Sequence, residues 1–158
     1  MNFQTMNKQR KFVLIAAAIG LISCFLPWVT ISIDIFGISK SNSANGLDNW
    51  RGIFALLAFA GAGVVAFMGD QTKTMDQKSW FIALACGAIA ALGTLLFLLK
   101  IDTGFGVSYG FGIFIALAAA IAVVASAYMF RSPGVSIKGG FDSLKSDIEK
   151  KTDGNPNT

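Results

Sequence analysis

Few side chains in this sequence could do covalent or acid–base chemistry. There is no histidine among the 158 residues, so the commonest general base and metal ligand is missing. The two cysteines, Cys24 and Cys86, both lie within apolar runs, where a thiol is usually a small packing residue. Their spacing is not that of a metal site, and neither lies in a loop where a disulfide framework would form.

Three aspartates, Asp34, Asp48 and Asp102, are the remaining candidates for chemistry. All three lie between apolar runs on the same expected side of the protein. If they approached one another, they could hold a cation or act as an acid–base pair. The alternative, which we favour, is that each carboxylate caps a turn and is solvated. We therefore predict no catalytic residues, no metal site and no cofactor, and a protein that is not an enzyme.

The elements that carry these residues are four long apolar runs that contain no Asp, Glu, Lys or Arg. The chain is 54% hydrophobic and 14% charged, whereas a soluble domain is roughly 25% charged. A bilayer core about 30 Å thick needs roughly 17–25 helical residues to cross it. The fold class predicted is thus an all-α membrane protein, with a four-transmembrane-helix bundle in residues 1–131 and spans at 12–33, 52–68, 80–99 and 105–130.

The missing charges also exclude functions. Proton relays, ion-coupled transporters and voltage sensors use ionisable side chains at membrane depth, and the four runs hold none. A passive pore formed by several copies stays open, since Ser, Thr and backbone carbonyls can line one. Thr94, Ser126 and Tyr128 are the candidates, although packing is the simpler role for each.

Basic residues are distributed unevenly around the runs. On one side of a four-span protein lie Lys8, Arg10, Lys11, Lys73, Lys78, Arg131, Lys138, Lys145, Lys150 and Lys151. The other side has only Lys40, Arg51 and Lys100. This asymmetry places both termini in the cytoplasm by the positive-inside rule. No stripe of interleaved aromatic and basic residues is present, so a nucleic-acid partner is not indicated.

Residues 20–28, GLISCFLPW, allow two interpretations. Leu21-Ile22-Ser23-Cys24 fits the cleavage point of a bacterial lipoprotein signal, which would leave Cys24 as an acylated N-terminus and only three spans. However, the apolar run continues past the cysteine to Ile33. We favour an intact first helix, with Pro27 loosening its last third.

The segments at the membrane boundaries carry weaker patterns. Residues 30–35 alternate strictly, which predicts a short extended segment, and Asn45-Gly46 predicts a turn, so a small β-like cap is expected outside. Trp28, Trp50 and Trp80 are predicted interfacial anchors. The polar tail, residues 132–158, is either disordered or contains a short amphipathic helix at 141–151 on the inner membrane surface.

Small residues recur at every fourth position of the runs, which puts them along helix faces where backbones can approach closely. The predicted helix-packing residues are Gly20, Ala83, Gly87, Ala91, Gly106, Gly110, Ala116 and Ala120. A further set on the fourth run is Ala118, Ala122 and Ser126. These faces either close the chain's own bundle or join another subunit, with the fourth run as the expected contact.

Three short motifs, FLPW, NGLDNWRG and GVSYGFGIFIAL, resemble a pattern in small bacterial four-span proteins without an established activity. The resemblance covers residues 12–130 and implies a multi-pass protein of the bacterial cytoplasmic (inner) membrane. More loosely, Trp28, Gly46-Leu47 and Trp50 are similar to the claudin arrangement, but the paired outer cysteines are missing and the loop is shorter.

We therefore expect a membrane subunit that works by contact with other membrane proteins, or with copies of itself, within the lipid bilayer. The alternative is a passive pore or a membrane-perturbing effector made of several copies.

Overall fold

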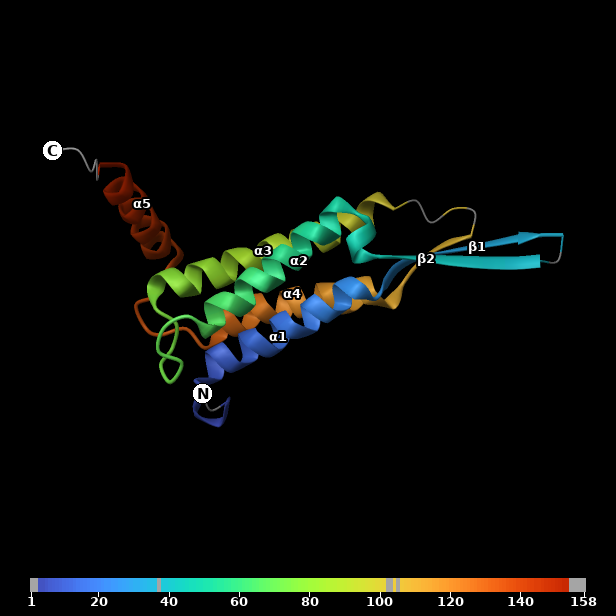
Figure 1. Cartoon of the computed structure of the whole chain (residues 1–158). Helices are drawn as coiled ribbons and strands as arrows, with labels where there is room; N and C mark the ends of the chain where they lie inside the picture. Colours follow the sequence, from blue (N-terminus) through green and yellow to red (C-terminus); the bar gives the residue numbers. More distant parts are fainter. Residues whose placement is uncertain (1–2, 37, 102–103, 105, 154–158) are drawn as a thin grey trace.

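A computed structural model of the chain (Figure 1) describes residues 3–36, 38–101, 104 and 106–153. Asp102, and Phe105 at the predicted start of the fourth span, lie outside these residues. The elements in chain order are η1 (Phe3–Thr5), α1 (Lys8–Phe25), β1 (Pro27–Ile35), β2 (Ile38–Asn45), η2 (Gly46–Asp48), α2 (Trp50–Phe67), α3 (Gln77–Lys100), β3 (Val107–Tyr109), α4 (Phe111–Met129) and α5 (Ile137–Asp153).

Helices α1 to α4 lie side by side, and the β1–β2 hairpin continues outward from one end of them (Figure 1). α1 packs against α2 and α4, and α3 packs against the same two helices. One core cluster surrounds Trp28 and Phe59 toward the hairpin, and a second surrounds Trp80 and Val123 toward the other end. The start of α1 and helix α5 both lie at the end opposite the hairpin (Figure 1).

Among the described residues, α2, α3 and α4 are long and apolar enough to cross a membrane. Their lengths are about 27, 36 and 28 Å at 1.5 Å per residue. α1 is as long as α2, but its first turn contains Lys8, Arg10 and Lys11. Three of the four expected helices thus have the length and composition that crossing a membrane requires.

The prediction that the first helix runs to Ile33 is wrong. Helix α1 ends at Phe25, and Leu26 is already extended, with φ −82° and ψ 159°. The cause is Pro27, because a residue that precedes proline is disfavoured in the helical region. The chain then enters β1, which pairs antiparallel with β2 from Pro27↔Asn45 to Ile35↔Ile38. The predicted extended segment at 30–35 is thus confirmed, within a longer strand.

The fourth helix begins later than the predicted residue 105. β3 pairs with β1 through Val29↔Tyr109, Thr30↔Ser108 and Ile31↔Val107, which gives a three-stranded sheet in the order β2-β1-β3. Gly110, the residue before α4, donates its N–H to the Trp28 carbonyl at 2.8 Å. The chain before α4 is therefore committed to the sheet, and α4 starts at Phe111.

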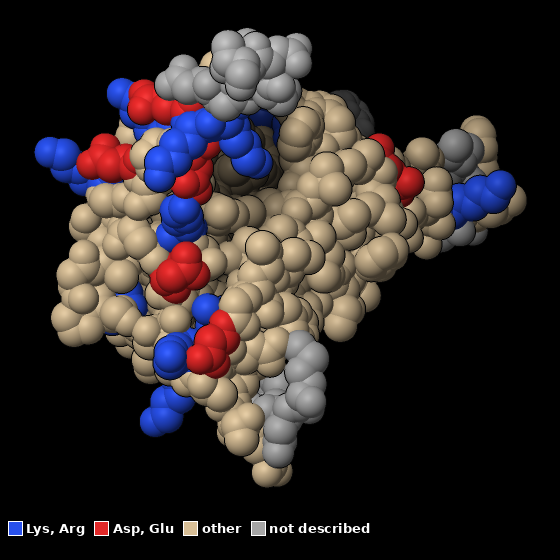
Figure 2. All heavy atoms as spheres, turned by 60° about the vertical axis from the view of Figure 1, so that its left-hand side comes forward, with Lys and Arg blue, Asp and Glu red and all other residues tan. Residues whose placement is uncertain are grey.

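The polar tail contains a longer helix than the predicted 141–151. α5 contacts α3, where Gly140 lies against the Phe81 ring: a Cβ added at Gly140 would come within 2.6 Å of the Phe81 Cβ. Lys78 of α3 also donates to the Asp147 carboxylate. In Figure 2 charged side chains gather over the end that carries α5, beside a broad flank without charge.

Candidate functional site

The predicted helix-packing residues mostly lie inside the chain's own bundle. Ala83, Ala116 and Ala120 are fully buried, and Ala91 is partly buried against the core cluster of the hairpin end. A Cβ added at Gly20 would lie 2.3 Å from the Phe59 ring. One added at Gly87 would lie 2.9 Å from Val123. These faces close seams between α1, α2, α3 and α4.

Gly106 and Gly110 do not lie on a helix face, contrary to the prediction, since both precede α4. Gly106 has a φ of +82°, and an added Cβ would lie 2.0 Å from the Ser32 carbonyl oxygen. At Gly110 the corresponding distance to the Pro27 carbonyl oxygen is 2.2 Å. Both glycines therefore allow the chain to run directly against β1.

Two of the three predicted interfacial tryptophans are instead core residues. Trp28 and Trp80 are both 0% exposed. The Trp28 indole N–H donates to the Ser23 carbonyl at 2.9 Å, and that of Trp80 donates to the Ala127 carbonyl at 2.7 Å. Only Trp50, which is 61% exposed, has the exposure of an anchor.

A buried hydrogen-bonded cluster around Gln9 and Arg10, at the α5 end, was not predicted from the sequence. Gln9 is fully buried; its amide nitrogen donates to Ala127 O at 2.9 Å, and its amide oxygen accepts from Met75 N at 2.9 Å. Arg10 is 2% exposed and donates to the carbonyls of Lys73, Ala66 and Met68. A cation there complements the carbonyls that end α2. This cluster joins α1 to the α2–α3 loop and to α4, which is a structural role.

Two carboxylates of the cluster considered above, those of Asp34 and Asp48, lie far apart, and Asp102 lies outside the described residues. Asp34 pairs with Ser39 close to the far end of the hairpin. Asp48 lies in η2 and accepts the Asn45 N–H at 2.8 Å. The length of β1 places these two about 20 Å apart along the strand. No group of three His, Cys, Asp or Glu side chains within the described ranges could hold a metal ion.

An apolar groove between α1 and α4 is one uncovered surface. It has a volume of about 340 Å³ and is almost entirely apolar. Its floor includes Ala118, Ala122 and Ser126, the small-residue set that the bundle itself does not close. Large side chains form its sides, among them Phe12 and Ile115.

The hairpin presents a second apolar surface, beyond the ends of the helices. Ile31 and Ile33 share one face with their β2 partners Asn42 and Lys40. All four side chains are exposed, and Ile38 is 71% exposed. Phe36, at the turn, has a positive φ of 52° and a fully exposed ring. The opposite face carries Thr30, Ser32, Ser41 and Ser43.

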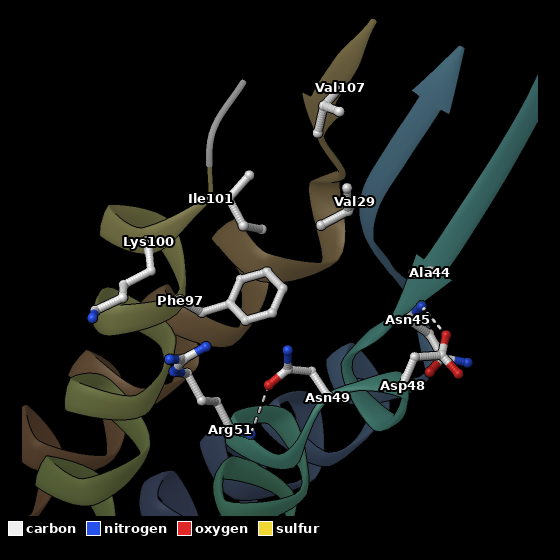
Figure 3. Close-up of a pocket in the computed structure, with 10 residues that line it drawn as sticks. All are labelled: Val29, Ala44, Asn45, Asp48, Asn49, Arg51, Phe97, Lys100, Ile101 and Val107. Atoms are coloured by element: carbon white, nitrogen blue, oxygen red, sulfur yellow. Dashed lines mark hydrogen bonds between the residues drawn. The ribbon is translucent and has the colours of Figure 1, made fainter. Parts of the chain in front are cut away.

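An outer cavity lies between the sheet and the adjacent ends of α2 and α3 (Figure 3). It has a volume of about 420 Å³. Val29, Phe97, Ile101 and Val107 give it an apolar wall, and its polar lining comprises Asn45, Asp48, Asn49, Arg51 and Lys100. The Phe97 ring meets that of Trp28 edge-on at 5.2 Å. The cavity joins residues from four segments of the chain, so no local motif could have revealed it.

Comparisons with models of protein families, with curated proteins and with solved structures find no match for this chain.

Proposed function

We propose that this protein is a non-enzymatic membrane protein that binds other membrane proteins, as an accessory subunit of a larger complex or as a homo-oligomer. In this proposal α1 to α4 all cross the bacterial cytoplasmic membrane, both termini are cytoplasmic, and the sheet lies outside. The basic residues support this orientation, because ten of the thirteen belong to the segments at the α5 end.

The apolar face of the hairpin carries the proposal. Inside a bilayer, exposed apolar side chains contact lipid and require no partner. Ile33, Phe36 and Ile38, however, lie past the helix ends on an element that also carries Asp34 and Lys40. Contiguous apolar surface in water is costly and marks a site of association. A partner that covers this face would remove that cost.

The groove between α1 and α4 supports a second contact within the bilayer. Small residues at every fourth position let a foreign helix approach the α4 backbone closely, and such packing drives association in lipid. The groove therefore fits a transmembrane helix of the same partner or of a second copy.

Crosslinking in the native membrane tests the hairpin contact. A photoreactive amino acid at Ile38 should give one discrete adduct, and Ile33→Ser in the same chain should abolish it. The same reagent at Ser41, on the polar face, is the matched control and should give none. Equal adducts from both faces would show that the hairpin makes only random encounters, and the proposal would fail.

Native mass spectrometry of the gently extracted protein tests the groove and separates the alternatives. Ala122→Leu should remove the bound partner, whereas Ala88→Leu, on the exposed side of α3, should not. A closed ring of identical chains that conducts ions would instead indicate the passive pore. The pore has less support, since Thr94 is buried and donates to the carbonyls of Ala90 and Ala91.

A further inference from the structure

Two of the three basic residues on the sheet side of the protein line a single cavity. Arg51 is the second residue of α2, Lys100 ends α3, and both line the outer cavity. Figure 3 shows Arg51 on the first turn of α2 and Lys100 at the end of α3. The third, Lys40, lies in the hairpin. Because basic residues are scarce on this side, two at one cavity form a local concentration of positive charge.

Within the part of the chain that the structure describes, the positive charges at this cavity outnumber the negative ones. Neither Arg51 nor Lys100 takes part in the ion pairs found there. Among the described lining residues there is one carboxylate, that of Asp48, which accepts the Asn45 N–H, so two cations and one carboxylate leave an excess of one positive charge. The Arg51 guanidinium lies over the Trp50 ring, 4.9 Å from its centre, a contact with the ring face that uses none of its N–H groups as hydrogen-bond donors. Such a pair is suited to an anionic oxygen group.

An apolar groove starts at the same arginine. It runs between α2 and α3 on the lipid-facing side, has a volume of about 220 Å³, and is lined by Trp50, Arg51, Phe54, Ile89, Leu92, Gly93 and Leu96. Gly93 puts no side chain into the groove, and the nearest atom to an added Cβ is the Arg51 carbonyl oxygen at 3.6 Å. Arg51 is thus the one residue that lines both the polar cavity and the apolar groove.

We propose that this combined site binds an anionic phospholipid of the outer leaflet. The phosphate lies at Arg51 and Lys100, and one acyl chain lies in the groove between α2 and α3. A cation at the boundary of the bilayer, with an interfacial tryptophan beside it and an apolar groove below it, matches both ends of such a molecule. Neither a soluble anion nor an uncharged lipid would use both parts. The inference does not depend on the proposed partner contacts.

The test uses the full chain in detergent, with retained lipid measured by native mass spectrometry after exchange into phosphatidylglycerol or phosphatidylcholine. Phosphatidylglycerol should be retained more strongly than phosphatidylcholine, because the quaternary ammonium of phosphatidylcholine offsets its phosphate and would be repelled by Arg51 and Lys100. Arg51→Gln should weaken retention about tenfold, as expected from the loss of charge-assisted hydrogen bonds. Lys40→Gln is the matched control and should change nothing. Equal retention of both lipids, or an unchanged Arg51→Gln protein, would overturn the proposal.

The acyl-chain part is tested separately. Gly93→Leu fills the groove and should lower phosphatidylglycerol retention, whereas Ala88→Leu on the same helix should leave it unchanged. Glycerol phosphate, which has the anion but no acyl chain, should fail to displace the lipid at equal concentration. If glycerol phosphate displaced the bound lipid as effectively as added phosphatidylglycerol does, the site would be one for small phosphates, and the lipid proposal would be wrong. Unchanged helical circular dichroism and thermal unfolding of each variant confirm that it is folded.

Discussion

The amide nitrogen of Gln9 donates to the carbonyl oxygen of Ala127 at 2.9 Å, although the two residues are 118 positions apart in the chain. The same carbonyl accepts the Trp80 indole N–H, and the Gln9 amide oxygen accepts the Met75 N–H. One buried side chain thus joins the first helix to the last helix of the bundle and to the loop between α2 and α3. Gln9 and the adjacent Arg10 are both buried.

Replacing Gln9 by leucine should destabilise the protein by about 1–3 kcal/mol, because the buried Met75 N–H would lose its acceptor. The measurement is thermal or denaturant unfolding in detergent. Gln71→Leu is the control, since Gln71 is only half-buried and its side chain donates to the Phe67 carbonyl in an exposed hydrogen bond. Similar losses from both variants would contradict the role assigned to Gln9.

Gly20→Ala should cost about 1–3 kcal/mol, because its methyl group would overlap the ring of Phe59, which is fully buried and cannot swing away. Gly63→Ala makes the same chemical change in a helix where the nearest neighbour to the new methyl group is the Ala17 Cβ at 3.8 Å. It should be neutral or stabilising by up to about 1 kcal/mol. Unfolding curves of the two variants compare the effect of the same methyl group on stability at a tightly packed helix contact and at a loosely packed one.

Gly106→Ala should disrupt the pairing of β1 with β3. The new methyl group would meet the Ser32 carbonyl, and the positive φ adds strain of about 1 kcal/mol or more. Gly134 also has a positive φ, of +91°, but nothing lies within 4 Å of an added Cβ. Gly134→Ala should therefore show the strain alone. Hydrogen exchange at the Ser32 N–H, which bonds to the Gly106 carbonyl, reports the difference.

Docking of α5 on α3 should weaken in acid. The hydrogen bond from Lys78 is the main cause that holds the pKa of Asp147 below its usual value, with Lys150 and Lys151 adding to it. A carboxyl with a lowered folded pKa contributes stability above its unfolded pKa of about 3.9 and loses it as the pH falls through the folded value. The protection factors of the α5 amides, which correct for the intrinsic pH dependence of exchange, should therefore fall below about pH 4, within the range where carboxylates protonate.

The control for this pH effect is Asp147→Asn, which removes the titrating group. Its α5 should exchange faster than the wild type at neutral pH and should respond less to acid. If the variant and the wild type followed the same pH profile, other carboxylates would be responsible.

Much of the helical architecture could be predicted from hydropathy, because long runs without charge are rare outside membranes and their length matches α2, α3 and α4. The early end of the first helix could also have been predicted, because Pro27 disfavours the helical conformation of Leu26, the residue before it. The alternation at residues 30–35 correctly predicted a strand because side chains in a strand alternate between its two faces.

Only the tertiary structure decided which small residues and tryptophans face inward. A tryptophan at a helix end looks the same in sequence whether lipid or protein surrounds it, and Trp28 and Trp80 are buried because neighbouring segments offer them backbone acceptors. Likewise, Gly106 is needed because Ser32 lies beside it, some seventy residues earlier in the chain. Arg51 and Lys100 likewise line one cavity only because α2 packs against α3. Such contacts depend on how separate elements pack, and they cannot be predicted from the residues that neighbour each position in the sequence.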